Sequence, residues 1–148
     1  MLFHTKQRRG KKTADNIILL QPTTPFRNWQ DIDRAIEIFT QSSADSLISV
    51  VSAENVHPYT MYREIGSRLE PLLGDKHGLR RQEFPKIYLR NGAIYISKRS
   101  LIMEHNRLIG DEPAFYEMPR LRSINIDDEI DLQIAKLLMK EDPDERFV

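Results

Sequence analysis

The centre of the chain reads Arg81-Gln82-Glu83-Phe84-Pro85-Lys86-Ile87-Tyr88-Leu89-Arg90-Asn91-Gly92-Ala93-Ile94-Tyr95-Ile96. Its first part is charged and broken by a proline, and its last four residues form strands readily and can be buried on both faces. We therefore expect a loop that leads into a core strand. Planar guanidinium and amide groups at the strand entrance suit recognition of a carboxylate, a hydroxyl or a phosphate. The alternative is an exposed loop with ordinary surface charge.

The composition predicts one domain with a sizeable core, because the chain has 148 residues of which 40% are apolar. Its 22 basic and 22 acidic residues balance, which gives no electrostatic argument for a nucleic-acid or membrane partner. Basic residues gather between Lys6 and Lys12. We interpret this cluster as a solvated terminus, with a nucleic-acid arm or a lipid-surface tail as alternatives.

Several classes of protein are excluded by what the sequence lacks. There is no cysteine, which excludes disulfides, thiol catalysis and thiolate metal sites. No apolar run approaches the roughly 20 residues of a membrane span, and the first residues lack the apolar segment of a secretory signal. We expect a soluble, cytoplasmic protein.

The amino-terminal half predicts a strand, a stiff loop, a helix and a second strand. Ile17 to Leu20 is a continuous apolar block, the pattern of a strand covered on both faces in a parallel sheet. The loop Gln21-Pro22-Thr23-Thr24-Pro25-Phe26-Arg27 follows, and ligands bind at the carboxyl ends of strands in open α/β sheets. Asn28 and Asp31 predict the start of a helix over 29–41, and a strand at 47–51 completes a βαβ unit.

The remaining elements are expected in order along the chain. Residues 59–65 predict a strand, and 66–78 a hairpin or arm that packs on a second subunit, with a surface loop as the alternative. A short helix at 98–105, a strand at 114–118 and a final helix follow. Its stripe of Ile130, Ile134, Leu137 and Leu138 is expected to be buried.

An acidic segment, Ser123-Ile124-Asn125-Ile126-Asp127-Asp128-Glu129-Ile130-Asp131, precedes the final helix. In an extended segment Asn125 and Asp127 point to the same side. Such oxygen ligands suit a hard cation such as Mg²⁺. Capping of the final helix by these carboxylates is the alternative, and the two roles can coexist. The four histidines have no close metal-ligand spacing, and nothing marks a nucleophile elbow.

Three segments together resemble the cytidylyltransferases that couple CTP to sialic acid and other nonulosonic acids. They are Leu19 to Arg27, Arg81-Gln82 with Asn91 to Ile96, and Ser123 to Leu132. The resemblance runs from about Asp15 to Met139. It implies a partial Rossmann-like α/β nucleotidyltransferase sheet with flanking helices. It divides the chain into a basic tail (1–15), a cytidylyltransferase-like domain (16–140, with a substrate and dimerisation arm at about 56–90) and an acidic tail (141–148).

The resemblance also implies the chemistry and the site. The sugar's anomeric hydroxyl attacks the α-phosphate of CTP in a magnesium-dependent reaction, and pyrophosphate leaves. Asp127 would hold Mg²⁺, with Asn125 as a neutral second ligand. Six residues would bind substrate, namely Gln21, Arg27, Arg81, Gln82, Asn91 and Tyr95. The partners implied are a nonulosonic acid and a second copy of the chain in a homodimer.

The chain departs from the family pattern in three places. A basic phosphate loop that grips CTP is expected well before Gln21, and only 20 residues precede that position. Asn125 stands where an aspartate is common, and Leu89 stands where some relatives carry arginine. We therefore expect the sugar-binding part of a CMP-nonulosonic acid synthetase that is inactive alone and meets CTP only when the missing half is supplied. The alternative is a non-catalytic sugar-binding or oligomerisation module.

Overall fold

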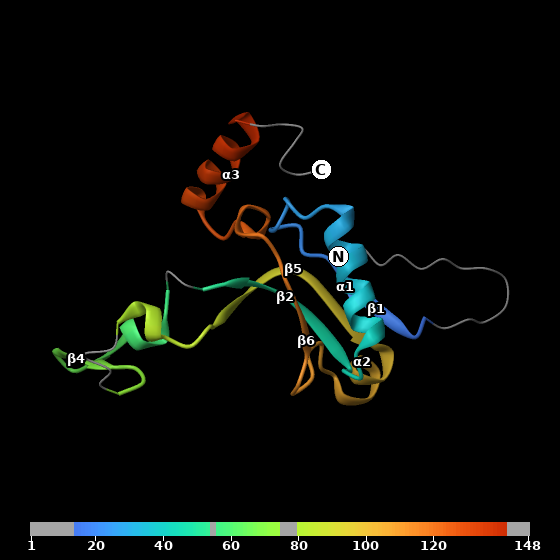
Figure 1. Cartoon of the computed structure of the whole chain (residues 1–148), viewed down its shortest axis with the longest axis horizontal. Coiled ribbons are helices and arrows are strands. Elements are labelled where there is room, and N and C mark those ends of the chain that lie inside the picture. Colours follow the sequence, from blue (N-terminus) through green and yellow to red (C-terminus); the bar gives the residue numbers. More distant parts are fainter. Residues whose placement is uncertain (1–13, 54–55, 75–79, 142–148) are drawn as a thin grey trace. The chain divides into compact units, whose positions relative to one another are not determined.

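A computed structural model describes residues 14–53, 56–74 and 80–141 of the chain. They form a mixed α/β structure (Figure 1) whose described parts fall into two compact units. The first unit contains residues 14–51 and 90–141, and the second contains the described residues between 52 and 89. The basic cluster from Lys6 to Lys12 and the acidic tail after Glu141 lie outside the described residues.

A four-stranded mixed sheet forms the centre of the first unit. Its strand order is β1 (Asn16–Leu19), β5 (Tyr88–Lys98), β2 (Ser46–Ser52) and β6 (Ala114–Glu117). β2 and β6 are parallel, whereas β1 and β5 are antiparallel. The expectation that β1 lies in a parallel sheet was therefore wrong, because β1 pairs antiparallel with β5. An apolar run shows that both faces are covered, but it does not state the direction of the neighbouring strand.

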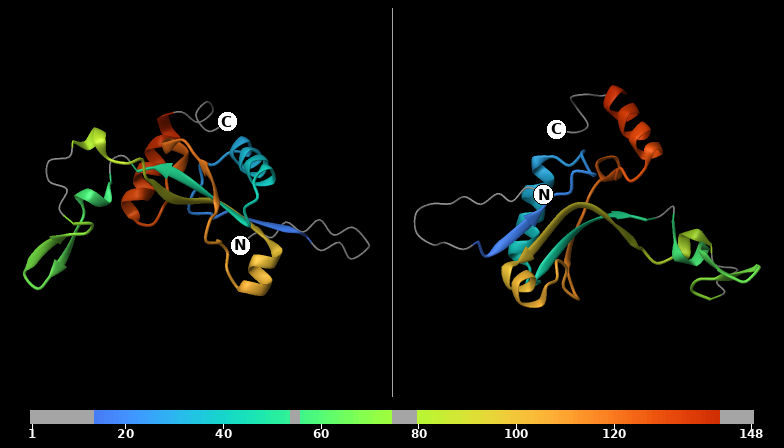
Figure 2. Two further views of the ribbon diagram at one scale, coloured as in Figure 1. Left: turned by 60° about the horizontal axis from the view of Figure 1, so that its bottom comes forward. Right: turned by 180° about the vertical axis from the view of Figure 1, so that it is seen from behind.

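Helix α1 (Trp29–Gln41) packs on this sheet and has the predicted bounds. A capping box starts it, in which the side chain of Asn28 accepts from the Asp31 backbone N–H and the Asp31 carboxylate accepts from the Asn28 backbone N–H. Ala35 and Phe39 bury its inner face against core residues of the strands, namely Leu47, Ile94 and Ile96. Figure 2 gives two further views of this packing.

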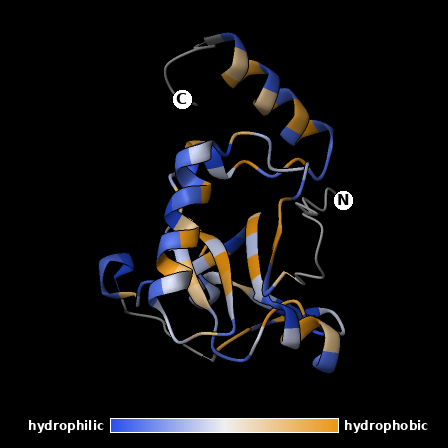
Figure 3. Cartoon of the chain, turned by 90° about the vertical axis from the view of Figure 1, so that its right-hand side faces the viewer, coloured by the Kyte–Doolittle hydropathy of each residue, from blue (hydrophilic) through white to orange (hydrophobic). Residues whose placement is uncertain are grey.

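The other two helices are α2 (Arg99–His105) and α3 (Glu129–Glu141). The predicted burial of the α3 stripe was wrong. Ile130, Ile134 and Leu137 are 70%, 43% and 57% exposed, while the small Ala135 is buried. Apolar bands are visible along this helix in Figure 3. Periodicity identifies an apolar face but not the surface that covers it. None of the described helices combines the length and apolar character that crossing a membrane requires.

The second unit contains the predicted hairpin, formed by antiparallel β3 (Tyr62–Ile65) and β4 (Arg68–Pro71). An ion pair between Arg63 and Glu70 joins the two strands at 2.9 Å. The first strand was expected to begin at residue 59. It begins later because Pro58 opens a short 3₁₀ turn, η1 (Pro58–Thr60). A second such turn, η2 (Arg81–Glu83), precedes β5.

Candidate functional site

The loop from Gln21 to Arg27, here called the glutamine turn, is held together by its last residue. The Arg27 guanidinium donates to the backbone carbonyls of Gln21 at 2.6 Å and Thr24 at 2.7 Å. Burial of this group lowers the pKa of Arg27 below its ordinary value. The guanidinium therefore shapes the loop, and its predicted contact with substrate stays a prediction.

The side chain of Gln21 lies against the backbone of β5 at Gly92. Gly92 has a φ of +77°, in the left-handed region that glycine adopts most readily. A Cβ atom added there would overlap the side-chain oxygen of Gln21. Glycine at this position thus meets two requirements, a backbone conformation and a close approach.

Thr24 and Asn91 connect the glutamine turn to the interior of the sheet. The Thr24 hydroxyl, which is fully buried, donates to the backbone carbonyl of Asn91 at 3.0 Å. The Asn91 side-chain oxygen accepts from the Ser49 hydroxyl at 2.6 Å, and its amide nitrogen donates to the Ser123 hydroxyl at 2.9 Å. Asn91 is only 4% exposed. Its amide is used within the protein, and its predicted contact with substrate stays a prediction.

The segment from Asn125 to Asp131, here called the acidic corner, lies beside the glutamine turn. The Ile126 backbone N–H donates to the Thr23 carbonyl at 2.8 Å. The Thr24 hydroxyl lies 3.4 Å from the side-chain oxygen of Asn125, although these residues are 101 positions apart. The side-chain nitrogen of Asn125 donates to the Asp127 carboxylate at 2.6 Å, which confirms that these two side chains share one side of the segment.

Capping is the role that the structure gives to the carboxylates at the start of α3. The Asp131 N–H donates to the Asp128 carboxylate at 2.9 Å, and the Asp128 N–H donates to the Asp131 carboxylate at 3.3 Å. This reciprocal pair is a capping box centred on Asp128, which agrees with the expected alternative that carboxylates of this segment cap the final helix. The described residues contain no group of three or more histidine, aspartate or glutamate side chains arranged to hold a metal ion.

A buried ion pair ties the segment before the acidic corner to the start of α1. Asp31 is fully buried and receives two hydrogen bonds from Arg122, at 2.9 and 2.8 Å, and one from the Tyr116 hydroxyl at 2.8 Å. Burial alone raises the pKa of the Asp31 carboxyl, but the donors around it outweigh burial and hold that pKa below its ordinary value. Burial and the neighbouring carboxylate raise the pKa of Tyr116.

Tyr95 lies in β5 opposite Leu19, two residues before the glutamine turn. It is 6% exposed, and the Arg90 guanidinium carbon lies 5.9 Å from its ring centroid.

The contacts described above show that the first unit brings together the glutamine turn, the part of β5 around Gly92 and the acidic corner. Whether Tyr95 lines a sugar pocket stays a prediction.

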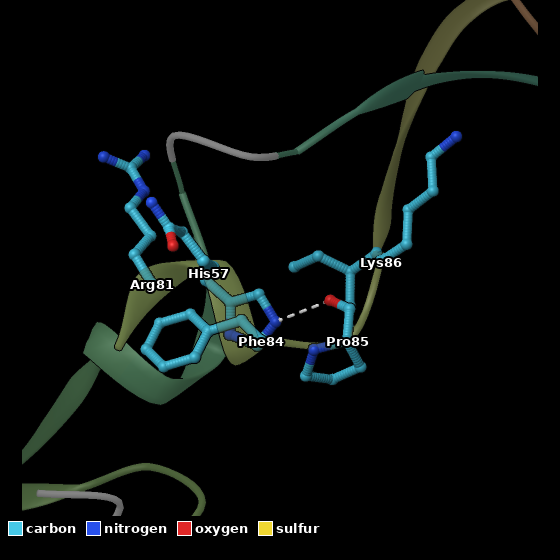
Figure 4. Close-up of a pocket in the computed structure, with 7 residues that line it drawn as sticks. His57, Arg81, Phe84, Pro85 and Lys86 are labelled. Atoms are coloured by element: carbon cyan, nitrogen blue, oxygen red, sulfur yellow. Dashed lines mark hydrogen bonds between the residues drawn. The ribbon is translucent and has the colours of Figure 1, made fainter. Parts of the chain in front are cut away.

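The second unit contains a pocket of its own, of about 450 Å³, whose lining includes Arg81, Gln82 and Lys86. In Figure 4 the side chains of Arg81 and Lys86 extend on either side of the rings of Phe84 and Pro85. His57, 5% exposed, contributes a ring nitrogen 3.2 Å from the Pro85 carbonyl. The predicted carboxylate-binding residues Arg81 and Gln82 thus line the same pocket as Lys86.

Four residues of these networks were not predicted from the sequence, namely Thr24, Ser49, His57 and Arg122. Ser49 carries a usable signal, because it is the one hydroxyl residue within the apolar run 47–51 of β2 and buried hydroxyls are hydrogen-bonded. Arg122 carries no such signal, since a single arginine in a charged segment is ordinary surface composition.

Comparisons with known proteins bear on the same segments. No protein-family model matches the chain. It is 35% identical over 134 residues to a CMP-N,N'-diacetyllegionaminic acid synthase of Legionella pneumophila and 31% identical over 127 residues to a post-translational flagellin modification protein B of Campylobacter coli. These matches cover 85% and 86% of the chain and 54% of each relative.

An N-acylneuraminate cytidylyltransferase A of Danio rerio is 30% identical over 129 residues, which cover 86% of the chain and 30% of that protein. The chain thus spans about half the length of the first two relatives, and less of the third. The regions matched lie in the carboxyl-terminal part of these relatives. The chain therefore belongs to the N-acylneuraminate cytidylyltransferase family and corresponds to the carboxyl-terminal part of its members.

Proposed function

We propose that this chain supplies the sugar-acid side of a CMP-nonulosonic acid synthetase with a Rossmann-like nucleotidyltransferase fold. In the complete reaction a bond forms between the sugar's anomeric oxygen and the α-phosphorus of CTP, the bond to the departing pyrophosphate breaks, and the hydroxyl proton is lost. The names of the relatives support this reaction class. Because the matched region is about half of two relatives, we assign only sugar-acid recognition to this chain alone.

One observation carries the assignment. The three segments on which the family resemblance rests are far apart in sequence. The glutamine turn nevertheless contacts the other two, β5 at Gly92 and the acidic corner through Thr23. Gln21 lies over Gly92, and the Ile126 N–H bonds to the turn at Thr23. Segments that meet in this way can present their side chains to one ligand, which is the arrangement that a site for a sugar acid needs.

Within this proposal each polar residue has a role that its chemistry allows. The side-chain amide of Gln21 can donate to and accept from sugar hydroxyls. Arg81 and Gln82, which belong to the second unit, have the chemistry to bind a carboxylate, because a guanidinium offers two parallel donors to it. Tyr95 and Arg90 form the aromatic and cationic wall next to the turn.

Magnesium at Asp127 belongs to the sequence prediction, but the residues do not fit a ready-made cation site. Asn125 contributes an amide rather than a carboxylate, and its N–H group bonds to Asp127. Asp128 and Asp131 cap α3. No step of the proposed function is therefore routed through a metal ion.

A homodimer is also part of the proposal, with residues 56–90 as its contact arm. The hairpin exposes apolar side chains that a second subunit would cover, since Ile65 and Leu69 are 54% and 70% exposed. Sedimentation equilibrium of the chain and of Leu69→Lys tests this part. The proposal expects a dimer that the substitution weakens, and a monomer at all concentrations would contradict it.

Calorimetry tests the function directly. The chain is titrated with N-acetylneuraminic acid, N,N'-diacetyllegionaminic acid and CTP. We expect binding of at least one sugar acid, loss of about tenfold in affinity on Gln21→Ala, and no change on Gln41→Ala, a matched substitution at the exposed end of α1. Absence of binding to both sugars would support the alternative of an oligomerisation module. Release of pyrophosphate from CTP by the chain alone would contradict the assignment of sugar-acid recognition alone to this chain.

A further inference from the structure

We propose that Asn125 holds the acidic corner in a hydrogen-bonded form with low affinity for divalent cations, and that a single substitution, Asn125→Asp, converts it into a cation site. The inference concerns this chain's own residues and does not require the proposed function. It starts from the contact between the side-chain nitrogen of Asn125 and the Asp127 carboxylate, at 2.6 Å.

The orientation of the Asn125 amide follows from its two neighbours. Asp127 is an acceptor only, so the group facing it must be the amide N–H. The amide oxygen then lies on the other side, 3.4 Å from the Thr24 hydroxyl, which shares its one hydrogen between this oxygen and the nearer Asn91 carbonyl at 3.0 Å. A cation bound between Asn125 and Asp127 would need that oxygen turned toward Asp127, which breaks both contacts. The present arrangement therefore competes with cation binding.

The neighbouring carboxylates do not replace the missing ligand. One oxygen of Asp131 accepts from the backbone N–H groups of both Asp127 and Asp128, at 3.0 and 3.3 Å, and one oxygen of Asp128 accepts from the Asp131 N–H. Both groups are thereby directed into the first turn of α3, where they also offset the positive end of the helix dipole. A cation at Asp127 would draw on a single carboxylate.

Asn125→Asp changes this balance with little change in shape. Two carboxylates would then face the same side at alternate positions and repel each other. A hard cation relieves that repulsion and binds oxygen ligands whose number and charge set its affinity. Aspartate can still accept from Thr24, so the link to the glutamine turn is kept. Replacement of this one side-chain amide by a carboxylate is thus expected to complete a cation site.

Manganese is a suitable probe because it prefers the same oxygen ligands as magnesium and is paramagnetic. Free Mn²⁺ is measured by electron paramagnetic resonance during titration of the full chain and of four variants. We expect the affinity of Asn125→Asp to exceed that of the natural chain at least tenfold. Asp127→Asn should bind no better than the natural chain. Line broadening in Asn125→Asp should centre on the backbone amides of residues 125–127.

Two further variants control for charge. Asn125→Asp/Asp127→Asn exchanges the amide and the carboxylate at constant net charge, and should bind like the natural chain. Gln41→Glu adds one negative charge on α1, away from the corner, and should change affinity less than threefold. The proposal is overturned if Asn125→Asp gains threefold or less, or if Gln41→Glu matches its gain. It is equally overturned if the natural chain already binds as tightly as Asn125→Asp and loses that binding with Asp127→Asn.

Discussion

Asp31 and Arg122, 91 positions apart in the chain, form a two-pronged ion pair with bonds of 2.9 and 2.8 Å around a carboxylate that is fully buried. The pair joins the first turn of α1 to the short 3₁₀ turn η3 (Arg120–Ser123), which leads into the acidic corner. The pair thus links the helix that follows the glutamine turn to the segment that precedes the acidic corner, in addition to the direct hydrogen bond from the Ile126 N–H to the Thr23 carbonyl.

Asp31→Asn should destabilise the chain by about 3 kcal/mol, because it leaves the Arg122 guanidinium without its carboxylate partner in a partly buried position. Urea unfolding measures the loss. Asp33→Asn, on the exposed side of the same helix turn, should change stability by less than about 0.5 kcal/mol. Equal effects from the two substitutions would show that the ion pair contributes nothing.

The same pair predicts a dependence of stability on pH. The pKa of Asp31 is depressed in the folded state, so between that pKa and the unfolded value of about 3.9 the unfolded chain binds more protons. The Asp31 contribution is present above pH 4 and is lost as pH falls through the folded pKa. Unfolding free energies from pH 7 to pH 2 should fall less steeply in Asp31→Asn than in the natural chain, and parallel curves would contradict this.

Gly92→Ala should cost about 1–2 kcal/mol for its positive φ, plus the smaller cost of displacing the end of the flexible Gln21 side chain, which the new Cβ would overlap. Gly66→Ala is the matched control, since Gly66 has a φ of +61° but nothing within reach of an added Cβ. Gly66→Ala should cost only the free energy of placing an alanine at a positive φ. Combining Gly92→Ala with Gln21→Ala should recover stability, and simple additivity of the two losses would contradict the close approach.

Asn91→Ala should destabilise by about 2–3 kcal/mol, because it leaves the buried Ser49 hydroxyl and the half-buried Ser123 hydroxyl short of a partner. Asn16→Ala, at the exposed start of β1, serves as its control and should be nearly neutral. Thermal unfolding of both variants distinguishes a scaffold role from a substrate role. A stable Asn91→Ala variant that loses only sugar binding would restore the original interpretation of Asn91 as a ligand contact.

The sequence predicted local structure well wherever one signal acted alone. α1 has the predicted ends because Asn28 and Asp31 form its capping box and Ala35 and Phe39 give it one apolar face. The hairpin in the second unit and the shared side of Asn125 and Asp127 follow equally local rules. These features need no knowledge of the rest of the chain.

Features that depend on what lies across the fold were not predicted. The exposure of Ile130 and Leu137 could not be predicted, because helical periodicity does not identify the surface that an apolar face meets. The antiparallel pairing of β1, the burial of Asn91 and the Asp31–Arg122 pair likewise involve partners distant in sequence. A single sequence gives the type of a residue but not its long-range partner.

The central claim, that the glutamine turn, β5 and the acidic corner form one site for a sugar acid, is tested most directly by nuclear magnetic resonance. The labelled chain is titrated with N-acetylneuraminic acid and with N,N'-diacetyllegionaminic acid while backbone amide shifts are followed. The account predicts saturable shifts with at least one of them that involve Gln21, Gly92 and Ile126 together. Shifts confined to other residues, or none at millimolar concentrations of both sugars, would contradict it.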